Sequence, residues 1–488
     1  MQNETKVQAL RAIVAAVHLP SVSDIEFEAS LIELRELAKT LGYQVVHTFI
    51  QKRAKFDSAA YLGVGKRQEM RRWVDPAAEV DDGFSEDDED GEPSAPAEPV
   101  PALQRAAKAG AARAKAAAQS AADEDTRRAD VILVDHEISP SQARNLEIEV
   151  GCEVMDRTMV ILEIFHRHAS SRAARAQVEI ARLGYMSPRL REAAKIAGPQ
   201  GRQRSGTGGR GAGESHAALD RQKIRNRIAE LELEIAAMDA DRQIQRARRA
   251  SNAGGGTGLA RVALVGYTNA GKSTLMRALT GSEVLVANKL FATLDTTVRA
   301  LHPESVPRVL VSDTVGFIKN LPHDLVASFK STLEEAAEAS LLLHVIDASD
   351  AGFERQLAVT DKVLEEIGAS AVPKIRVFNK IDMVGDSAAQ KEMEAALRTQ
   401  YPDCIVMSAR NAGDVAKMHA SIVKFFQRDL VETELFLPWS AQQLRGKIFS
   451  SCEVLDERAD NDGAFLRLRA DPATLATLRE QLGVAPIG

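Results

Sequence analysis

The chain has 488 residues, of which 45% are hydrophobic and 27% are charged, with a formal net charge of −7. This composition is ordinary for a globular protein, and it excludes a collagen-like, a fully disordered or a disulfide-stapled chain. One hydrophobic core stops growing near roughly 250–300 residues, so we expect several domains. The 3 cysteines, Cys152, Cys404 and Cys452, have no metal-ligand spacing, and an odd number of thiols fits a reducing compartment.

No segment resembles a signal peptide or a membrane helix. The N-terminus carries an acidic residue before its first base and lacks a long apolar stretch. The most apolar short runs, such as 341–346, are far below the roughly 20 residues that a membrane helix needs. We therefore expect a soluble, cytoplasmic protein with no membrane span.

Residues 1–156 predict an N-terminal α/β domain. Residues 32–41 carry apolar side chains at helical spacing, and residues 43–50 indicate a strand. The motif Gly63-Val64-Gly65-Lys66 then places two glycines beside a lysine, a pattern that can cradle a phosphate. Because the full P-loop pattern is missing there, we favour a turn from a strand into a helix.

An insertion at 76–128 interrupts this domain. It begins with an acidic run, continues with four closely spaced prolines and includes a stretch rich in Ala, Lys and Arg. Low-complexity segments and blocks of like charge cannot pack a core, so we expect a disordered insertion. A functional acidic segment that mimics nucleic acid is the alternative. After the insertion, residues 129–134 and 152–154 predict strands, and Ser139-Pro140 predicts a helix start.

Residues 157–250 predict a long helical hairpin. The pattern is helical over 157–191, a glycine-rich basic loop follows at 198–213, and apolar residues over 224–238 repeat at heptad spacing. We expect this stripe to pack against a neighbouring helix of the same domain rather than to form a dimer. Residues 172–249 contain 17 Arg or Lys against 9 Asp or Glu. Such a basic tip suits an RNA backbone, while a solvated charged surface explains the same charge equally well.

The domain predicted over 258–428 carries a complete phosphate-binding motif. An apolar strand leads into Gly266-Tyr267-Thr268-Asn269-Ala270-Gly271-Lys272-Ser273 and then into a predicted helix. The glycines let the backbone amides point at phosphate oxygens, and the helix start adds its positive dipole end. We expect Lys272 to bridge the β- and γ-phosphates and the Ser273 hydroxyl to bind Mg²⁺.

Three further segments identify the nucleotide. Asp313 ends a predicted strand and should hold Mg²⁺, and the amide of Gly316 can meet the γ-phosphate. The Asp382 carboxylate can accept from N1–H and the 2-amino group of guanine, whereas adenine would leave a buried Asp382 unpaired. The stem of Lys380 can cover the base, and the amides of 408–410 can contact guanine O6. All these groups follow predicted strands, at whose carboxyl ends open α/β sheets bind ligands, so we infer GTP rather than ATP.

A switch threonine is expected in the loop at 290–297. Thr293 is the predicted Mg²⁺ ligand there, and Thr297 is the alternative. The predicted metal ligands are Ser273, Thr293 and Asp313, and the predicted catalytic residues are Lys272, Thr293 and Gly316. The predicted nucleotide contacts are Gly266, Tyr267, Thr268, Asn269, Ala270, Gly271, Lys272, Ser273, Thr274, Phe291, Ala292, Thr293, Asp313, Thr314, Val315, Gly316, Asn379, Lys380, Asp382, Ser408, Ala409 and Arg410.

The residue after Gly316 bears on the rate of hydrolysis. Many GTPases place a glutamine there to orient the attacking water, whereas this chain has Phe317, which cannot hydrogen-bond water. We therefore expect slow intrinsic hydrolysis unless another group positions the water and neutralises charge. Asn269 either helps to hold a K⁺ ion between the phosphates or only braces the loop.

The chain resembles the HflX family of GTPases, within the TrmE–Era–Obg–YihA–HflX superfamily, over nearly its whole length except the insertion. The matching segments are 63–66, 139–147, 154–158, 164–165, 208–214, 220–222, 291–295, 313–318 and 321–323. Two departures, Ala212 where the family usually has proline and Thr296 where proline is common, concern the rigidity of loops rather than function.

The resemblance implies how the parts work together. Its members associate with the large ribosomal subunit, and some split stalled or stress-arrested ribosomes. By this resemblance the hairpin binds the ribosome, with its basic loop at 202–210 approaching ribosomal RNA. GTP would order the switches around Thr293 and Gly316, and the subunit would stimulate hydrolysis, which releases them.

The expected fold is α/β: a P-loop domain with a mostly parallel sheet, preceded by a small α/β domain and a helical hairpin and followed by a small α+β domain at 430–488. The favoured function is a ribosome-associated GTPase that splits or rescues stalled ribosomes. A GTP-gated ribosome- or RNA-binding module with incidental turnover is the alternative. A tRNA-modifying GTPase would need an added catalytic domain. For His166 and His168 we favour helix-face or RNA-contact roles over metal binding, and we favour a monomer.

Overall fold

The computed structural model describes residues 10–75, 128–196, 221–238, 240, 244, 260–281, 290–291, 297–319, 335–428 and 430–482. The chain divides into two compact units, Met1–Arg167 with Ala181–Ile228, and His168–Ile180 with Ala229–Gly488. The predicted α/β class with a mostly parallel nucleotide-domain sheet is confirmed. Within the described ranges, no helix combines the length and apolarity needed to cross a membrane. The finer division into four domains stays a prediction.

The first unit is built on a parallel four-stranded sheet with the strand order β2-β1-β3-β4. Its strands are β1 (Arg11–His18), β2 (Gln44–Lys52), β3 (Val131–Val134) and β4 (Glu153–Asp156). β1 was not predicted, yet it is buried from Ala12 to Val17, as expected of a strand covered on both faces. The other three strands were predicted to within a few residues.

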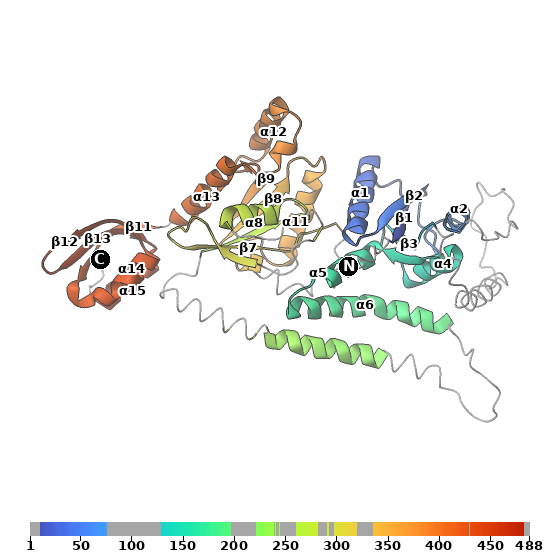
Figure 1. Cartoon of the computed structure of the whole chain (residues 1–488), viewed down its shortest axis with the longest axis horizontal. Helices are drawn as coiled ribbons and strands as arrows, with labels where there is room; N and C mark the ends of the chain where they lie inside the picture. The colour runs from blue at the N-terminus through green and yellow to red at the C-terminus, as the bar shows by residue number, and fades with distance from the viewer. Residues whose placement is uncertain are drawn as a thin grey trace, which may run out of the picture. The chain divides into compact units, whose positions relative to one another are not determined.

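Helices cover both faces of this sheet (Figure 1). Neighbouring residues of β2 show this, because side chains alternate along a strand. Thr48 accepts a hydrogen bond from Arg35 of α1 (Asp24–Thr40), and His47 stacks on Trp73 of α2 (Val64–Val74). α4 (Pro140–Val150) packs beside α2, and it begins at the predicted Ser139, which forms a capping box with Gln142.

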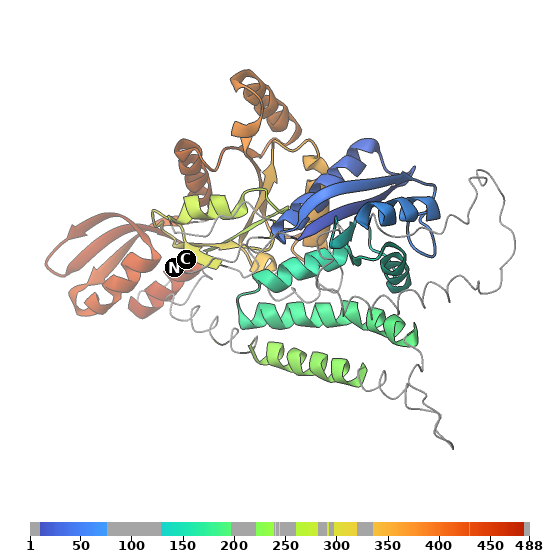
Figure 2. The same ribbon diagram turned by 45° about the vertical axis from the view of Figure 1, so that its right-hand side comes forward.

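The helical pattern predicted over 157–191 is two helices, α5 (Arg157–His168) and α6 (Arg172–Ile196). Ser171 explains the break, because its hydroxyl accepts the amide of Ala174 and so caps the start of α6. A helix over 221–238 lies beside α6 (Figures 1 and 2), and Arg172 forms an ion pair with Glu234. The predicted heptad stripe is therefore helical, with Leu231 its most buried member, and the basic loop at 198–213 lies outside the described residues.

The second unit contains a six-stranded sheet with the order β10-β9-β8-β5-β7-β6, in which β6 pairs antiparallel with β7 and the other pairs are parallel. The strands are β5 (Ala260–Gly266), β6 (Thr297–Ala300), β7 (Val309–Asp313), β8 (Leu341–Asp347), β9 (Lys374–Asn379) and β10 (Ile405–Val406). The helices are α8 (Lys272–Thr280), α11 (Phe353–Glu366), α12 (Ser387–Gln400) and α13 (Ala412–Gln427). Leu275 and Met276 of α8 share a buried apolar cluster with β5 and with Ile422 of α13, which fixes α8 behind the loop that precedes it.

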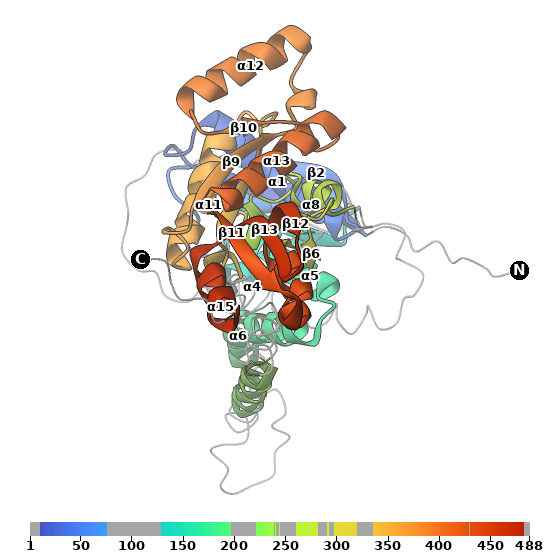
Figure 3. The ribbon, with the colours of Figure 1, turned by 90° about the vertical axis from the view of Figure 1, so that its left-hand side faces the viewer.

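The tail forms an antiparallel sheet with the order β11-β13-β12 (Figure 3). Its strands are β11 (Val431–Pro438), β12 (Glu453–Ala459) and β13 (Gly463–Ala470), and its helices are α14 (Arg445–Ser451) and α15 (Pro472–Leu482). Alternate residues of β11 and β13 share a core with these helices, as the predicted small α+β arrangement requires.

Candidate nucleotide site

The predicted phosphate loop joins β5 to α8 at the carboxyl edge of the six-stranded sheet. Gly266 has φ 147° and Gly271 has φ 97°, conformations that favour glycine. A Cβ on Gly266 would lie 2.1 Å from the carbonyl oxygen of Val345, and one on Gly271 would lie 2.2 Å from Asn379 Nδ2. Both space and backbone conformation therefore require glycine at the two ends of this loop.

Lys272 is buried at the start of α8. Its Nζ donates to the carbonyl oxygens of Gly266 at 3.0 Å and Tyr267 at 2.7 Å. Burial lowers the pKa of Lys272 to about 8, an effect that Asp313 opposes and Lys380 reinforces. A buried ammonium with so little compensating charge is a ready partner for an anion.

The predicted metal ligands that the structure describes lie together. The Ser273 hydroxyl donates to Asp313 Oδ2 at 2.7 Å, and Asp313 is fully buried at the end of β7. Such hard oxygen donors fit Mg²⁺, which is commonly bound by one or two protein groups together with water and substrate phosphates. Across the part of the chain that the structure describes, no three His, Cys, Asp or Glu side chains converge on a metal position. A magnesium site built on Ser273 and Asp313 would therefore need further ligands, such as water and phosphate oxygens.

The first switch is described only in part. Thr293, the predicted metal ligand, and Ala292 lie outside the described residues. Phe291 is buried, with φ 57°. Thr297, the alternative ligand, begins β6 and pairs with Asp313 in the antiparallel ladder.

The predicted switch segment around Gly316 is attached to the phosphate loop by backbone hydrogen bonds. The Thr268 amide donates to the Phe317 carbonyl at 2.8 Å, and the Phe317 amide donates to the Gly266 carbonyl at 3.1 Å. A Cβ on Gly316 would lie 3.0 Å from Lys272 Nζ, so the Gly316 backbone runs beside the lysine. Phe317 is 1% exposed, and its ring is thus part of the protein interior.

Asn379 ties two of the predicted segments together. Its Nδ2 donates to the Ala270 carbonyl at 2.9 Å, and its Oδ1 accepts the Ala409 amide at 2.9 Å. The amide of Ser408 donates to Asp414 and that of Arg410 to the Ser408 hydroxyl. The three amides predicted to face guanine O6 therefore already have acceptors within the protein.

The base-recognition residues differ in one respect from the prediction. Asp382 lies in a 3₁₀ turn directly after β9 and is exposed, whereas we expected a buried carboxylate. The short turn places it at the surface, so burial would have to come from the base itself. Lys380 Nζ pairs with Asp347 Oδ2 at 2.8 Å. We missed Asp347, although its place at the carboxyl end of β8 is where this fold collects ligand-binding groups.

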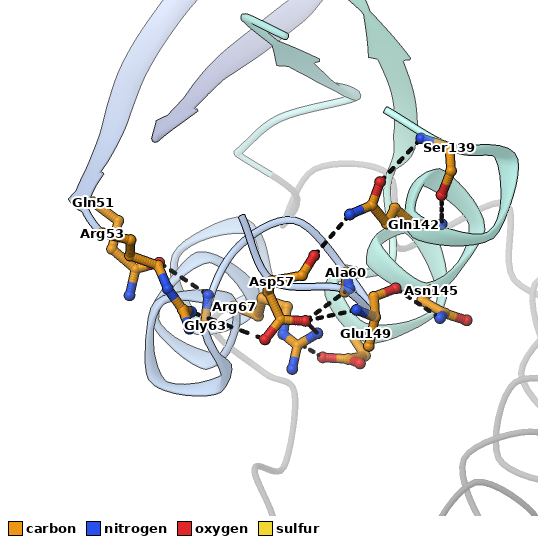
Figure 4. A network of polar contacts seen from close by, with 11 residues as sticks. Gln51, Arg53, Asp57, Ala60, Gly63, Arg67, Ser139, Gln142, Asn145 and Glu149 are labelled. Carbon is orange, nitrogen blue, oxygen red and sulfur yellow. Dashed lines mark hydrogen bonds and ion pairs between the residues drawn. The ribbon is translucent and has the colours of Figure 1, made fainter. Parts of the chain in front are cut away.

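The second glycine–lysine motif, at 63–66, is a turn into a helix, as favoured from the sequence. α2 begins directly after Gly63, whose amide donates to Gln51 Oε1 at 2.9 Å (Figure 4). Asp57 accepts two amides of its own loop, and Arg67 pairs with Glu149 at 2.9 Å. These polar groups around the motif are thus engaged within the chain.

Three family models match the chain. Residues 28–81 and 100–166 match the family described as GTP-binding GTPase N-terminal, and residues 168–249 match the GTP-binding GTPase middle region. Residues 261–380, which include the phosphate loop and Asn379, match the family described as 50S ribosome-binding GTPase.

Relatives named GTPase HflX match most of the chain. The one from Gluconacetobacter diazotrophicus is 51% identical over 98% of this chain and 99% of its own length. The one from Caldanaerobacter subterraneus is 38% identical over 94% of this chain and 90% of its own. Among solved structures, a GTP-binding protein from Sulfolobus solfataricus in complex with GDP is 21% identical, with a TM-score of 0.41, and the match covers 85% of this chain and 99% of that one.

Proposed function

Since the chain belongs to the HflX family of GTPases, we propose that it binds Mg²⁺ and GTP at the carboxyl edge of the six-stranded sheet and hydrolyses GTP on the large ribosomal subunit. One observation carries the placement of the nucleotide. Lys272 begins α8, Asp313 ends β7 and Asn379 ends β9, yet all three lie around the loop at 266–271, and Asn379 bridges that loop to the segment at 408–410.

The phosphates lie against the start of α8. The ammonium of Lys272 neutralises the β- and γ-phosphates, and the amide of Gly316 donates to the γ-phosphate. Ser273 and Asp313 hold Mg²⁺, with Thr293 as the further ligand expected from the sequence. Bound Mg²⁺ supplies positive charge that stabilises the phosphate oxygens during transfer.

Guanine lies over the turn after β9. Asp382 accepts from N1–H and the 2-amino group, and the stem of Lys380, held by Asp347, covers one face of the base. Replacing Asp382 with Asn should shift preference from GTP towards xanthosine triphosphate, because Asn presents a donor where guanine also donates. Binding of GTP that survives unchanged in Asp382→Asn would contradict this assignment.

Hydrolysis by the isolated chain is slow because Phe317 is buried and cannot orient water. Asn269 stands exposed in the loop with φ 60°, in a place to help hold K⁺ beside the phosphates. Equal hydrolysis rates in potassium and sodium buffers would exclude that role and leave Asn269 as a brace of the loop.

The ribosome is the proposed partner on two grounds. The domain that carries the nucleotide site matches a family described as 50S ribosome-binding GTPase. The hairpin region at 172–249 also has 17 basic against 9 acidic residues, which favours contact with an RNA backbone. We place the contact at the basic loop, 202–210, and we propose that GTP-dependent docking there splits or rescues stalled ribosomes.

Co-sedimentation with purified large subunits tests this proposal. Binding should be strong with a non-hydrolysable GTP analogue and weak with GDP, and subunits should stimulate GTP hydrolysis. Reversing the charge of Arg202, Arg204 and Arg210 together should weaken binding, whereas Arg398→Glu, on the exposed face of α12, is the matched control. Binding without stimulated hydrolysis would favour the alternative, a GTP-gated binding module, and absence of binding would overturn the ribosomal role.

A further inference from the structure

Tyr267, the second residue of the phosphate loop, reaches the predicted switch segment around Gly316 with its side chain. The Tyr267 hydroxyl accepts a hydrogen bond from the Lys319 amide at 2.8 Å. Tyr267 also forms an isolated parallel bridge with Phe317, and the residue is only 8% exposed. The hydrogen bonds of that bridge are made by the backbones of Gly266 and Thr268, and the Tyr267 hydroxyl adds a second attachment two residues further along, at Lys319.

These contacts surround the glycine that faces the phosphates. Before Gly316, the switch chain is held to β5 through the parallel pairing of Leu264 with Asp313. After Gly316, it is held by Phe317 and Lys319 through the contacts just described. The backbone is therefore fixed on both sides of Gly316, at Asp313 and at Phe317. A Cβ on Gly316 would lie 3.0 Å from Lys272 Nζ.

We propose that the Tyr267 hydroxyl is a positioning group for recognition of the γ-phosphate. By holding the Lys319 amide, it keeps Gly316 beside Lys272, where its own amide can donate to a third phosphate. The inference rests on the proposed placement of the triphosphate at Lys272 and Gly316. It adds a residue that acts through the switch and touches no phosphate with its side chain.

A switch held in this position should favour binding of GTP over GDP. GDP contacts the phosphate loop but has no group for the Gly316 amide to meet, so it gains nothing from a well-positioned switch. A triphosphate gains from that position, because a switch ordered beforehand costs less entropy to fix on binding. Losing the hydroxyl should weaken binding of triphosphate and leave binding of diphosphate unchanged.

The test compares Tyr267→Phe with the wild-type full chain. Dissociation constants are measured for fluorescent GDP and for a fluorescent non-hydrolysable GTP analogue. The variant should bind the analogue about threefold to tenfold more weakly, the range expected for one lost hydrogen bond, while GDP binding changes by less than about twofold. Tyr43→Phe is the matched control, since it removes a tyrosine hydroxyl that contacts Met155 in the other unit and should leave both constants unchanged.

A second measurement needs no substitution. In wild-type protein, hydrogen exchange at the Lys319 amide should be slower with the GTP analogue than with GDP, because a bound γ-phosphate stabilises the same switch position. The inference would be overturned if Tyr267→Phe left the ratio of the two affinities unchanged. It would also be overturned if the Lys319 amide exchanged equally fast with both nucleotides. A wild-type chain that binds neither nucleotide would instead overturn the proposed function.

Discussion

The chain contains a parallel four-stranded sheet and a mostly parallel six-stranded sheet, and the buried cations at their carboxyl edges have different kinds of partner. At the edge of the six-stranded sheet, buried Lys272 has two carbonyl partners, and its pKa is lowered to about 8. At the edge of the four-stranded sheet, Arg157 is equally buried, yet it pairs with Asp135 at 2.9 Å and also with Glu33.

The neighbouring carboxylate of the four-stranded sheet is satisfied in the same way. Asp156, at the end of β4, accepts from Arg189 at 2.7 Å, from the Tyr185 hydroxyl and from the amide of Met159. Burial, together with the charge of Asp156, raises the pKa of Tyr185. Parallel topology alone therefore does not make a ligand site. The edge of the six-stranded sheet suits an anion because buried Lys272 hydrogen-bonds two carbonyl oxygens and forms no ion pair as close as those of Arg157.

The largest effect on stability should come from breaking the ion pairs of Arg157 at the edge of the four-stranded sheet. Arg157→Met removes the guanidinium that pairs with buried Asp135 and with partly buried Glu33, so it should lower the free energy of unfolding by about 3–5 kcal/mol. Urea unfolding measures the change. Nucleotide affinity should stay within about twofold, because the site belongs to the other unit. The control is Arg398→Met, which breaks an exposed pair with Glu394 and should cost less than about 1 kcal/mol.

Removing the Lys272 ammonium at the edge of the six-stranded sheet should weaken nucleotide binding rather than destabilise the fold. Lys272→Met should weaken GTP binding about 30-fold or more, since truncating a buried charged partner costs about 2–5 kcal/mol. The lowered pKa of Lys272 means that its charged form is unfavourable in the folded state, so Lys272→Met should leave the free energy of unfolding of the empty protein unchanged or raise it. Titration calorimetry and urea unfolding give the two values. If Lys272→Met lost as much stability as Arg157→Met, the proposed difference between the two sheet edges would be wrong.

The smallest effect concerns His344, a buried histidine on β8 of the six-stranded sheet. Burial lowers the pKa of His344 on β8 to about 4, against an ordinary 6.5, with Asp361 opposing the shift and Lys374 and Arg376 reinforcing it. The unfolded state thus binds more protons between these values, so stability should fall as the pH drops from about 6.5 to 4. At about pH 5 the expected loss relative to pH 7 is about 1–2 kcal/mol.

His344→Gln provides the check on that loss. Glutamine stays neutral throughout, so the variant should lose less stability than wild type on acidification, as measured by urea unfolding at the two pH values. If both proteins lose the same free energy, the acid sensitivity comes from other groups.

Much of the second unit could be predicted because its motifs are local. The phosphate loop requires glycine, lysine and serine at fixed spacing between a strand and a helix, and β5 and α8 form as expected around Lys272. β1 of the first unit was missed because six buried apolar residues in a row show no alternation that would mark a strand. The break between α5 and α6 depends on a single cap, Ser171, within an otherwise helical pattern.

The sequence by itself determined the family and the α/β class, and it predicted the residues that should surround GTP, because short patterns with one chemical use indicate all three. Only the tertiary structure showed that Asp347 holds Lys380, that Tyr267 reaches Lys319, and that Arg157 is matched by Asp135. Each of these contacts joins residues between 22 and 52 positions apart. These contacts form because the order of the strands and the course of the loops bring the residues together. The spacing of the residues along the chain does not predict that arrangement.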